Sequence, residues 1–174
     1  CASLTHVTLP DDAQLTTIGK NAFFQCEKLA SISIPKNVTT IGKNAFYGCE
    51  KLASITIPNS VTAIADGVFA GCKALTTVTL SEGLQTIGKN AFLDCAALAS
   101  ISIPNSVTAI GDFAFQGCTA LKDVTVAWET PLQPNSDAFK QLPLDKIRLH
   151  VPEGKIGAYK AANVWRDFIV MADR

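Results

Sequence analysis

The sequence predicts a mainly β repeat solenoid, a stack in which each turn of 23 residues contributes one parallel strand. Two observations support this fold class. Cysteines recur five times at intervals of 23 residues, and apolar residues recur at fixed offsets from each cysteine. Such repetition is the signature of a repeat architecture, because a single unit cannot bury its apolar face alone. The cysteine column consists of Cys26, Cys49, Cys72, Cys95 and Cys118.

The first element of each turn is an expected strand that follows the cysteine. Its pattern, Leu-x-x-Ile-x-Ile, alternates apolar and polar residues, which is typical of a strand with one buried face. We therefore expect one set of side chains in a common core and the intervening set exposed, since a register shifted by one residue would reverse the two faces. The expected core set is Ile32, Ile34, Ile55, Ile57, Val78, Leu80, Ile101 and Ile103, and the expected exposed set is Ser33, Thr56, Thr79 and Ser102.

Three further elements complete the turn. Proline follows the strand in four copies, where its missing N–H is tolerated. The Val-x-x-Ile-Gly segment predicts a second short strand on the return side, with a bend at its glycine. The Ala-Phe-x-x-Cys segment predicts a turn, with one turn of 3₁₀ helix as an alternative form. Its phenylalanine is expected to form another core column: Phe23, Phe46, Phe69, Phe92 and Phe115.

The chain begins in the middle of a repeat. Cys1 stands in the same frame, and a two-residue insertion at 11–14 explains the longer spacing to Cys26. We expect five or six turns. No cap is predicted at Cys1, so we expect further chain or another chain to cover this end, which makes it a possible partner contact.

The repeat fades near residue 126, so we divide the chain into a solenoid (1–126) and a C-terminal capping segment of the same domain (127–174). A last strand is expected at Ile147, Leu149 and Val151, and a short helix in 153–163 with Ile156 and Tyr159 on one face. A stack needs such a cap because its final layer otherwise exposes apolar side chains and strand backbone. The residues expected to cover the last turn are Trp165, Phe168 and Ile169.

The repeat resembles the BspA-type leucine-rich repeat. The pattern Ala-Phe-x-x-Cys-x-x-Leu-x-x-Ile-x-Ile-Pro-x-x-Val-x-x-Ile-Gly runs through residues 45–65 and 91–111 with little departure, and the resemblance extends over residues 1–126. The tail from Leu149 to Trp165 resembles a terminal segment of surface proteins from anaerobic gut and oral bacteria.

This resemblance implies a right-handed leucine-rich-repeat stack in a bacterial protein that is secreted or displayed at the cell surface. It implies a non-catalytic adhesion or interaction module that binds a protein or glycan, with host-derived partners included. The family pattern brings no ligand-binding residue with it. A structural spacer that presents another part of a larger surface protein is the alternative function.

The balance of positive and negative charge limits the classes of partner that the sequence predicts. Lys plus Arg and Asp plus Glu each number 15, so a broad electrostatic footprint for nucleic acid is not expected. The apolar runs are too short to predict membrane insertion, and no signal segment is visible.

The cysteines and histidines predict no metal, cofactor or catalytic site. Cysteine packs as a small hydrophobe, and the metal spacing Cys-x-x-Cys does not occur, so a buried column of free thiols is favoured. Disulfides and a metal site are the weaker alternatives. His6 and His150 lie near opposite ends of the chain, and His6 is expected to be solvated on the outward face.

The outward face of the main sheet is the candidate binding surface. Its positions are rich in hydroxyls and nearly uncharged, which also suits plain β-propensity and cross-strand pairing. Trp128, in the loop 127–137, is either an exposed contact residue or a packing residue of the cap. The candidate residues are Ser33, Thr56, Thr79, Ser102, Asp123, Thr125 and Trp128.

Overall fold

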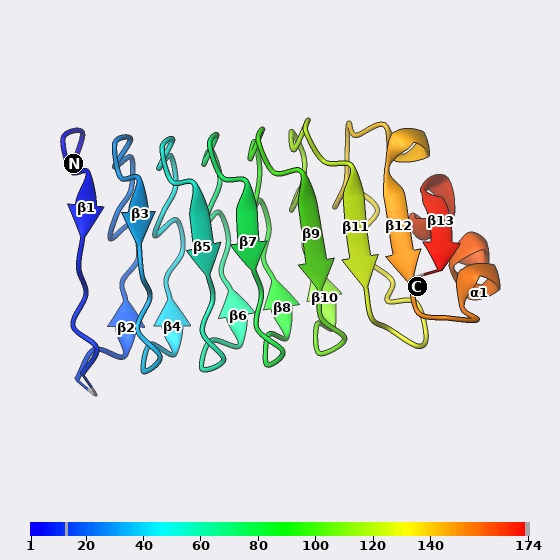
Figure 1. Ribbon diagram of the computed structural model, residues 1–174, viewed down its shortest axis with the longest axis horizontal. Coiled ribbons are helices and arrows are strands. Elements are labelled where there is room, and N and C mark those ends of the chain that lie inside the picture. The colour runs from blue at the N-terminus through cyan, green and yellow to red at the C-terminus, as the bar shows by residue number, and fades with distance from the viewer. Residues whose placement is uncertain (13, 173–174) are drawn as a thin grey trace.

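The computed structural model describes residues 1–12 and 14–172 and has the predicted solenoid fold, with a row of parallel strands along one side (Figure 1). Position 13, inside the predicted insertion at 11–14, lies outside the described residues. The strands of the main side are β1 (His6–Val7), β3 (Ser31–Ile32), β5 (Ser54–Thr56), β7 (Thr77–Thr79), β9 (Ser100–Ile103), β11 (Asp123–Val126), β12 (Arg148–Val151) and β13 (Ile169–Ala172).

The return side carries one short strand in each of the first five turns, as the Val-x-x-Ile-Gly segment predicts. These strands pair in parallel, for example Ala63 with Thr86 and Ile64 with Ile87. They are β2 (Thr17–Ile18), β4 (Thr40–Ile41), β6 (Ala63–Ile64), β8 (Thr86–Ile87) and β10 (Ala109–Ile110).

The register of the main strands confirms the predicted inside and outside. In the pair β5–β7, Ile55 lies opposite Val78 and Thr56 lies opposite Thr79, so each column stacks on itself. All eight side chains of the expected core set are buried, with at most 9% of their surface exposed. The four side chains of the expected outward set are exposed.

The phenylalanine column forms a continuous stack through the core. Consecutive rings from Phe46 to Phe115 lie 5.4–5.6 Å apart between centroids, and their planes differ by only 9–14°. Phe46, Phe69, Phe92 and Phe115 have no exposed surface, whereas Phe23 in the first complete repeat is half-buried. Phe139 continues the stack beyond the predicted end of the solenoid, 5.1 Å from Phe115.

The Ala-Phe-x-x-Cys segment is a turn, as predicted, and it is bonded both within itself and to its neighbour. The Cys49 N–H donates to the Phe46 carbonyl at 3.2 Å, and the Phe46 N–H donates to the Val68 carbonyl of the next repeat at 2.9 Å. The residue before each cysteine has a positive φ, which is 70° at Gly48. Gly42, in the bend column, instead packs closely on the preceding turn, because an added Cβ would lie 2.5 Å from the Lys20 nitrogen.

The five cysteines from Cys26 to Cys118 form a buried column of free thiols. Each thiol from Cys49 onward donates to the carbonyl of the phenylalanine 26 residues earlier, and the Cys72 Sγ lies 3.2 Å from the Phe46 oxygen. Burial raises the pKa of the Cys49 and Cys118 thiols to about 12. These thiols are therefore held in their neutral form.

The cap follows the prediction in most elements. It contains η1 (Leu144–Lys146), β12, α1 (Ile156–Ala161) and η2 (Trp165–Asp167), and Tyr159, Trp165 and Phe168 are buried. The prediction was wrong for Ile169, whose side chain is 46% exposed. Ile169 begins the unpredicted strand β13, whose alternation turns Ile169 and Met171 outward while Val170 packs on the core.

The stack does not stop at residue 126, because β12 pairs with β11 and β13 pairs with β12. The division of the chain at this residue stays a prediction. No helix among the described residues has the length and apolar character needed to cross a bilayer.

Candidate binding surface

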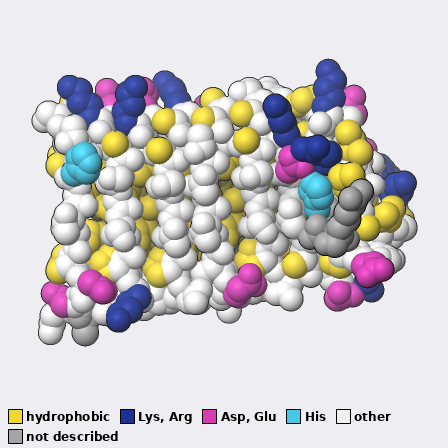
Figure 2. Space-filling view, in the orientation of Figure 1, with side chains coloured by type: hydrophobic (Ala, Val, Ile, Leu, Met, Phe, Trp, Pro, Cys, Tyr) yellow, Lys and Arg dark blue, Asp and Glu magenta, His cyan; other side chains and the backbone are white. Residues whose placement is uncertain are grey.

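The outward side chains of the middle strands form a nearly uniform hydroxyl face. We define the hydroxyl face as Ser33, Ser54, Thr56, Thr77, Thr79, Ser100 and Ser102, all of which are exposed. Figure 2 shows charged side chains along the rims of this view and at its C-terminal end, while the middle is free of them. A partner that meets the middle of the face would therefore meet hydrogen-bonding groups that can both donate and accept.

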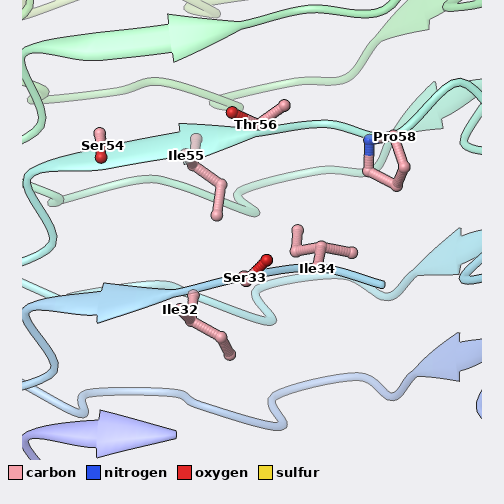
Figure 3. A pocket seen from close by; sticks show the side chains of 7 residues that line it. All are labelled: Ile32, Ser33, Ile34, Ser54, Ile55, Thr56 and Pro58. Carbon is pink, nitrogen blue, oxygen red and sulfur yellow. The ribbon is translucent and has the colours of Figure 1, made fainter. Parts of the chain in front are cut away.

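Three hollows lie along the outward face of the described strands. One lies over the paired strands β1 and β3, and the other two coincide with interruptions of the strand ladder. Strands β3 and β5 are in contact but are not hydrogen-bonded neighbours in the described sheets, and the same holds for β7 and β9. A hollow of about 200 Å³ lies at the first gap, with Ser33 and Thr56 among its lining residues (Figure 3). A second of about 310 Å³ lies at the other gap, lined in part by Thr79 and Ser102.

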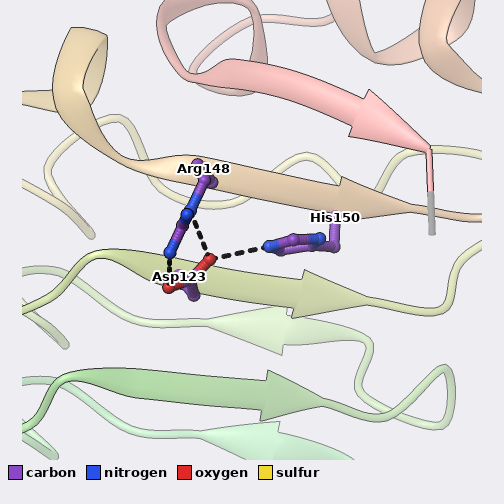
Figure 4. Close-up of polar contacts among 3 residues, drawn as sticks. All are labelled: Asp123, Arg148 and His150. Carbon is purple, nitrogen blue, oxygen red and sulfur yellow. Dashed lines mark hydrogen bonds and ion pairs between the residues drawn. The ribbon is translucent and has the colours of Figure 1, made fainter. Parts of the chain in front are cut away.

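Charged groups converge at the C-terminal end of the outward face. Asp123 on β11 receives bonds from two side chains of β12, because Arg148 lies opposite it in register and His150 lies two residues further on the same face (Figure 4). The Asp123 Oδ1 lies 2.7 Å from both the Arg148 Nε and the His150 Nε2, and its Oδ2 lies 2.6 Å from an Arg148 terminal nitrogen. We call these three residues the Asp123 cluster.

Hydrogen bonds from Arg148, and next from His150, hold the pKa of Asp123 below its ordinary value. In return, the hydrogen bond to Asp123 raises the pKa of the Arg148 guanidinium. The bidentate arrangement fixes both planar groups, which sets this end of the surface apart from the rotatable hydroxyls of the middle.

An aspartate–histidine pair is also a component of nucleophilic catalytic sites, but it needs a hydroxyl or thiol bonded to the imidazole. Within the described residues, no hydroxyl or thiol is hydrogen-bonded to His150. Nor do those residues contain a group of three or more histidine, cysteine or acidic side chains arranged to hold a metal ion. The geometry of the Asp123 cluster fits a bidentate Arg148–Asp123 ion pair with an additional hydrogen bond to His150.

Trp128 is a packing residue, so its place on the candidate surface is corrected. Its side chain is buried, its Nε1–H donates to the Val107 carbonyl at 2.8 Å, and its ring packs against Trp165. The Tyr159 hydroxyl donates to the Trp128 carbonyl at 2.8 Å. The loop 127–137 thus directs the side chain of Trp128 toward the cap.

The structure divides the other candidate residues into two groups. Ser33 and Thr56 line one hollow and Thr79 and Ser102 the other, whereas Asp123 and Thr125 are half-buried at the C-terminal end. Arg148 and His150 were not predicted as partners of Asp123. Their signal was present, because in a strand with Ile147, Leu149 and Val151 inward, the side chains between them must face outward.

The chain matches the BspA type Leucine rich repeat region in six copies, over residues 1–122 and 39–163. It belongs to the BspA-type leucine-rich-repeat family. Membership in this family supports a protein-interaction module. No curated protein matches the chain.

Solved structures of bacterial proteins resemble the chain along most of its length. A leucine-rich-repeat protein of T. pallidum is 27% identical to this chain, with a TM-score of 0.67. The match covers 92% of this chain and 79% of the T. pallidum chain. A leucine-rich cell-surface protein of Faecalibacterium prausnitzii is 25% identical, with a TM-score of 0.56 and coverage of 97% and 57%. The pneumococcal vaccine antigen PcpA, 20% identical with a TM-score of 0.80 and coverage of 98% and 42%, shares the fold. The chain thus spans less than two thirds of the last two proteins.

Proposed function

We propose that this chain is a non-catalytic interaction module that binds a protein or glycan through its hydroxyl face. The observation that supports the proposal is the combination of an exposed, uncharged face with two hollows at the strand gaps. Solenoids present broad surfaces of this kind to partners. Adhesion to a host macromolecule is the biological role that this proposal favours.

The proposal extends to location at the cell surface or outside the cell. It is supported by the similarity to the cell-surface protein of F. prausnitzii. Antibody labelling of intact cells of the source organism tests it. Labelling only after the cells are opened would contradict it.

A charge-insertion experiment tests the binding surface. The intact protein is screened by surface plasmon resonance against immobilised matrix proteins and a glycan array, and the strongest binder is then measured with Thr79→Lys. We expect a loss of about tenfold or more, since a lysine placed in a neutral hydroxyl contact leaves a charge to be desolvated. The matched control is Thr40→Lys, which makes the same change at an exposed position of β4 on the return side.

The alternative function is a spacer that holds another part of a larger surface protein. The uniformity of the hydroxyl face favours it, because tuned contact surfaces are enriched in Trp, Tyr and Arg. If the intact protein binds nothing in the whole screen, the spacer function is favoured. Equal loss with Thr40→Lys and Thr79→Lys would contradict binding through the hydroxyl face.

A further inference from the structure

A second hollow surface lies on the turn edge of the solenoid, away from the hydroxyl face. The residue before each cysteine forms a column with positive φ, and this column carries a side chain at Gln25 and Asp94 but none at the two turns between them, Gly48 and Gly71. The missing side chains leave a hollow of about 260 Å³. We call it the Tyr47 trough, after the residue that forms one of its walls.

The floor of the trough is open above Gly71. A Cβ built at Gly71 would meet only the backbone of Gly48, at 3.5 Å, which is ordinary van der Waals contact. The third glycine of the column, Gly117, differs because the side chain of Asp94 covers it, with its Oδ1 only 2.0 Å from an added Cβ. Gly48 is partly covered as well, because the Gln25 Cγ would lie 3.3 Å from an added Cβ. The opening is therefore specific to the turn at Gly71, where the preceding residue of the column, Gly48, has no side chain to cover it.

One wall of the trough is an exposed aromatic ring. Tyr47 is 37% exposed although it has a repeat on either side, and its ring stacks on that of Phe24 at 5.0 Å with an interplanar angle of 15°. The Tyr47 hydroxyl forms no hydrogen bond within the described residues. A rigid ring with a free polar tip combines apolar contact area with a hydrogen-bonding group.

The rest of the lining, which we call the polar wall, carries mixed charge. Glu50 and Lys73 form an ion pair at 2.6 Å, and Glu27 and Asp94 also line the trough. Carboxylate oxygens accept hydrogen bonds and the lysine ammonium donates them, so this wall can satisfy neighbouring hydroxyls of either role. Lys73 also neutralises part of the acidic charge, which disfavours a purely cationic ligand.

The backbone N–H and carbonyl groups of Gly48 and Gly71, which form the floor of the trough, already have hydrogen-bond partners. The Gly48 and Gly71 N–H groups donate to Ala70 and Leu93 of the following repeats, and their carbonyls accept from Glu50 and Lys73 at 2.9 Å. A peptide added as a strand would need free main-chain donors and acceptors, and the floor offers none. A ligand in the trough must therefore be recognised by side chains.

We propose that the Tyr47 trough binds a saccharide, with a pyranose ring packed on Tyr47 and its hydroxyls bonded to Glu50 and Lys73. A pyranose ring presents C–H groups on its faces and hydroxyls around its rim, which matches one aromatic wall and one mixed polar wall. The pattern of few polar groups around an apolar contact is typical of small-ligand sites. This site is separate from the hydroxyl face and does not depend on the function proposed for that face.

Filling the trough is the direct test. Gly71→Asn places a side chain over the floor, and the column tolerates it because Gln25 and Asp94 already adopt φ of 54° and 57°. Wild type and variants are applied to an array of neutral oligosaccharides of glucose, galactose, mannose and N-acetylglucosamine, and the strongest binder is titrated by calorimetry. We expect losses of about tenfold or more for Gly71→Asn and for Tyr47→Ala, whereas Tyr47→Phe retains most of the affinity.

The matched control is Gly154→Asn in the cap, where φ is +75° and no atom lies within 4 Å of an added Cβ. It carries the same chemical change at a positive φ outside the trough, and all variants are checked for equal denaturant midpoints. The proposal is overturned if wild type binds no oligosaccharide at millimolar concentration, or if Gly71→Asn and Tyr47→Ala bind as wild type does. Loss with Thr79→Lys alone would place the saccharide on the hydroxyl face and would likewise overturn the trough.

Discussion

The phenylalanine column and the aromatic cluster of the cap bury rings in contrasting geometries. In the column, each ring packs nearly parallel to an identical ring one turn away. In the cap, Phe139 meets Trp165 at 62° and Phe168 at 87°, and both tryptophans donate hydrogen bonds to loop carbonyls. One residue type thus packs the interior through repetition, whereas the end of the stack is closed by several aromatic residues that meet at differing angles, with Trp165 in contact with four other rings.

The largest expected effect comes from removing a ring of the column. Phe69→Ala should lower the free energy of unfolding by about 3–5 kcal/mol, because it deletes a fully buried ring between two others and leaves a cavity. Denaturant melting followed by circular dichroism measures the loss. A value below about 1 kcal/mol would mean that the stack collapses around the vacancy and that the column is not a rigid core.

A smaller loss of stability is expected when one hydrogen bond of the cap is removed. Trp165→Phe keeps an aromatic ring but removes the Nε1–H that donates to the Leu132 carbonyl. We expect a loss of about 1–3 kcal/mol, the cost of leaving a part-buried acceptor unsatisfied. Phe92→Leu, which changes the column without removing a polar bond, is the comparison variant. If Trp165→Phe is neutral, packing alone closes the stack.

The order of these two effects was only partly predictable from the sequence. Phe69 could be assigned to the core because its offset from Cys72 recurs in every turn. Trp165 could be assigned to the cap, but its partner Leu132 lies 33 residues earlier in a segment without repeats, and no periodicity locates such a contact.

The candidate surface shows the same division. Alternation within the repeat correctly placed Ser33, Thr56, Thr79 and Ser102 outward, whereas Ile169 and Trp128 lie where the repeat frame no longer applies. The Asp123 cluster could have been predicted by extending the register by one strand. The hollows between β3 and β5 and between β7 and β9 could not, because their sequences differ little from those of the paired strands.

A pH titration extends the comparison to the charged end of the sheet. The lowered pKa of Asp123 means that the native state favours the ionised carboxylate. Asp123 therefore contributes to the free energy of unfolding at pH values above its ordinary pKa of 3.8, and this contribution is lost as the pH falls from 3.8 through the lowered pKa of the folded state. We expect a small loss of stability in this acid range that is reduced in Asp123→Asn. The measurement is the thermal midpoint between pH 3 and pH 6. Identical acid profiles for the two proteins would show that the cluster contributes nothing.

The smallest expected effect lies on the hydroxyl face itself. Thr79→Ala should change the free energy of unfolding by no more than about 0.5 kcal/mol, because the side chain is exposed and forms no bond that stabilises the core. Denaturant melting alongside Phe69→Ala gives the contrast. A loss comparable to that of the buried ring would mean that cross-strand hydroxyl pairs are a major source of sheet stability.

The thiol column gives the molecule an internal set of reporters. Only the thiolate reacts with alkylating reagents, and burial raises the pKa of Cys49, Cys72, Cys95 and Cys118, so each reacts only when its own turn opens. Because successive thiols are one repeat apart, the order of their modification records the sequence in which neighbouring turns separate. Quantitative labelling followed by mass spectrometry would therefore locate, turn by turn, where unfolding of this solenoid begins.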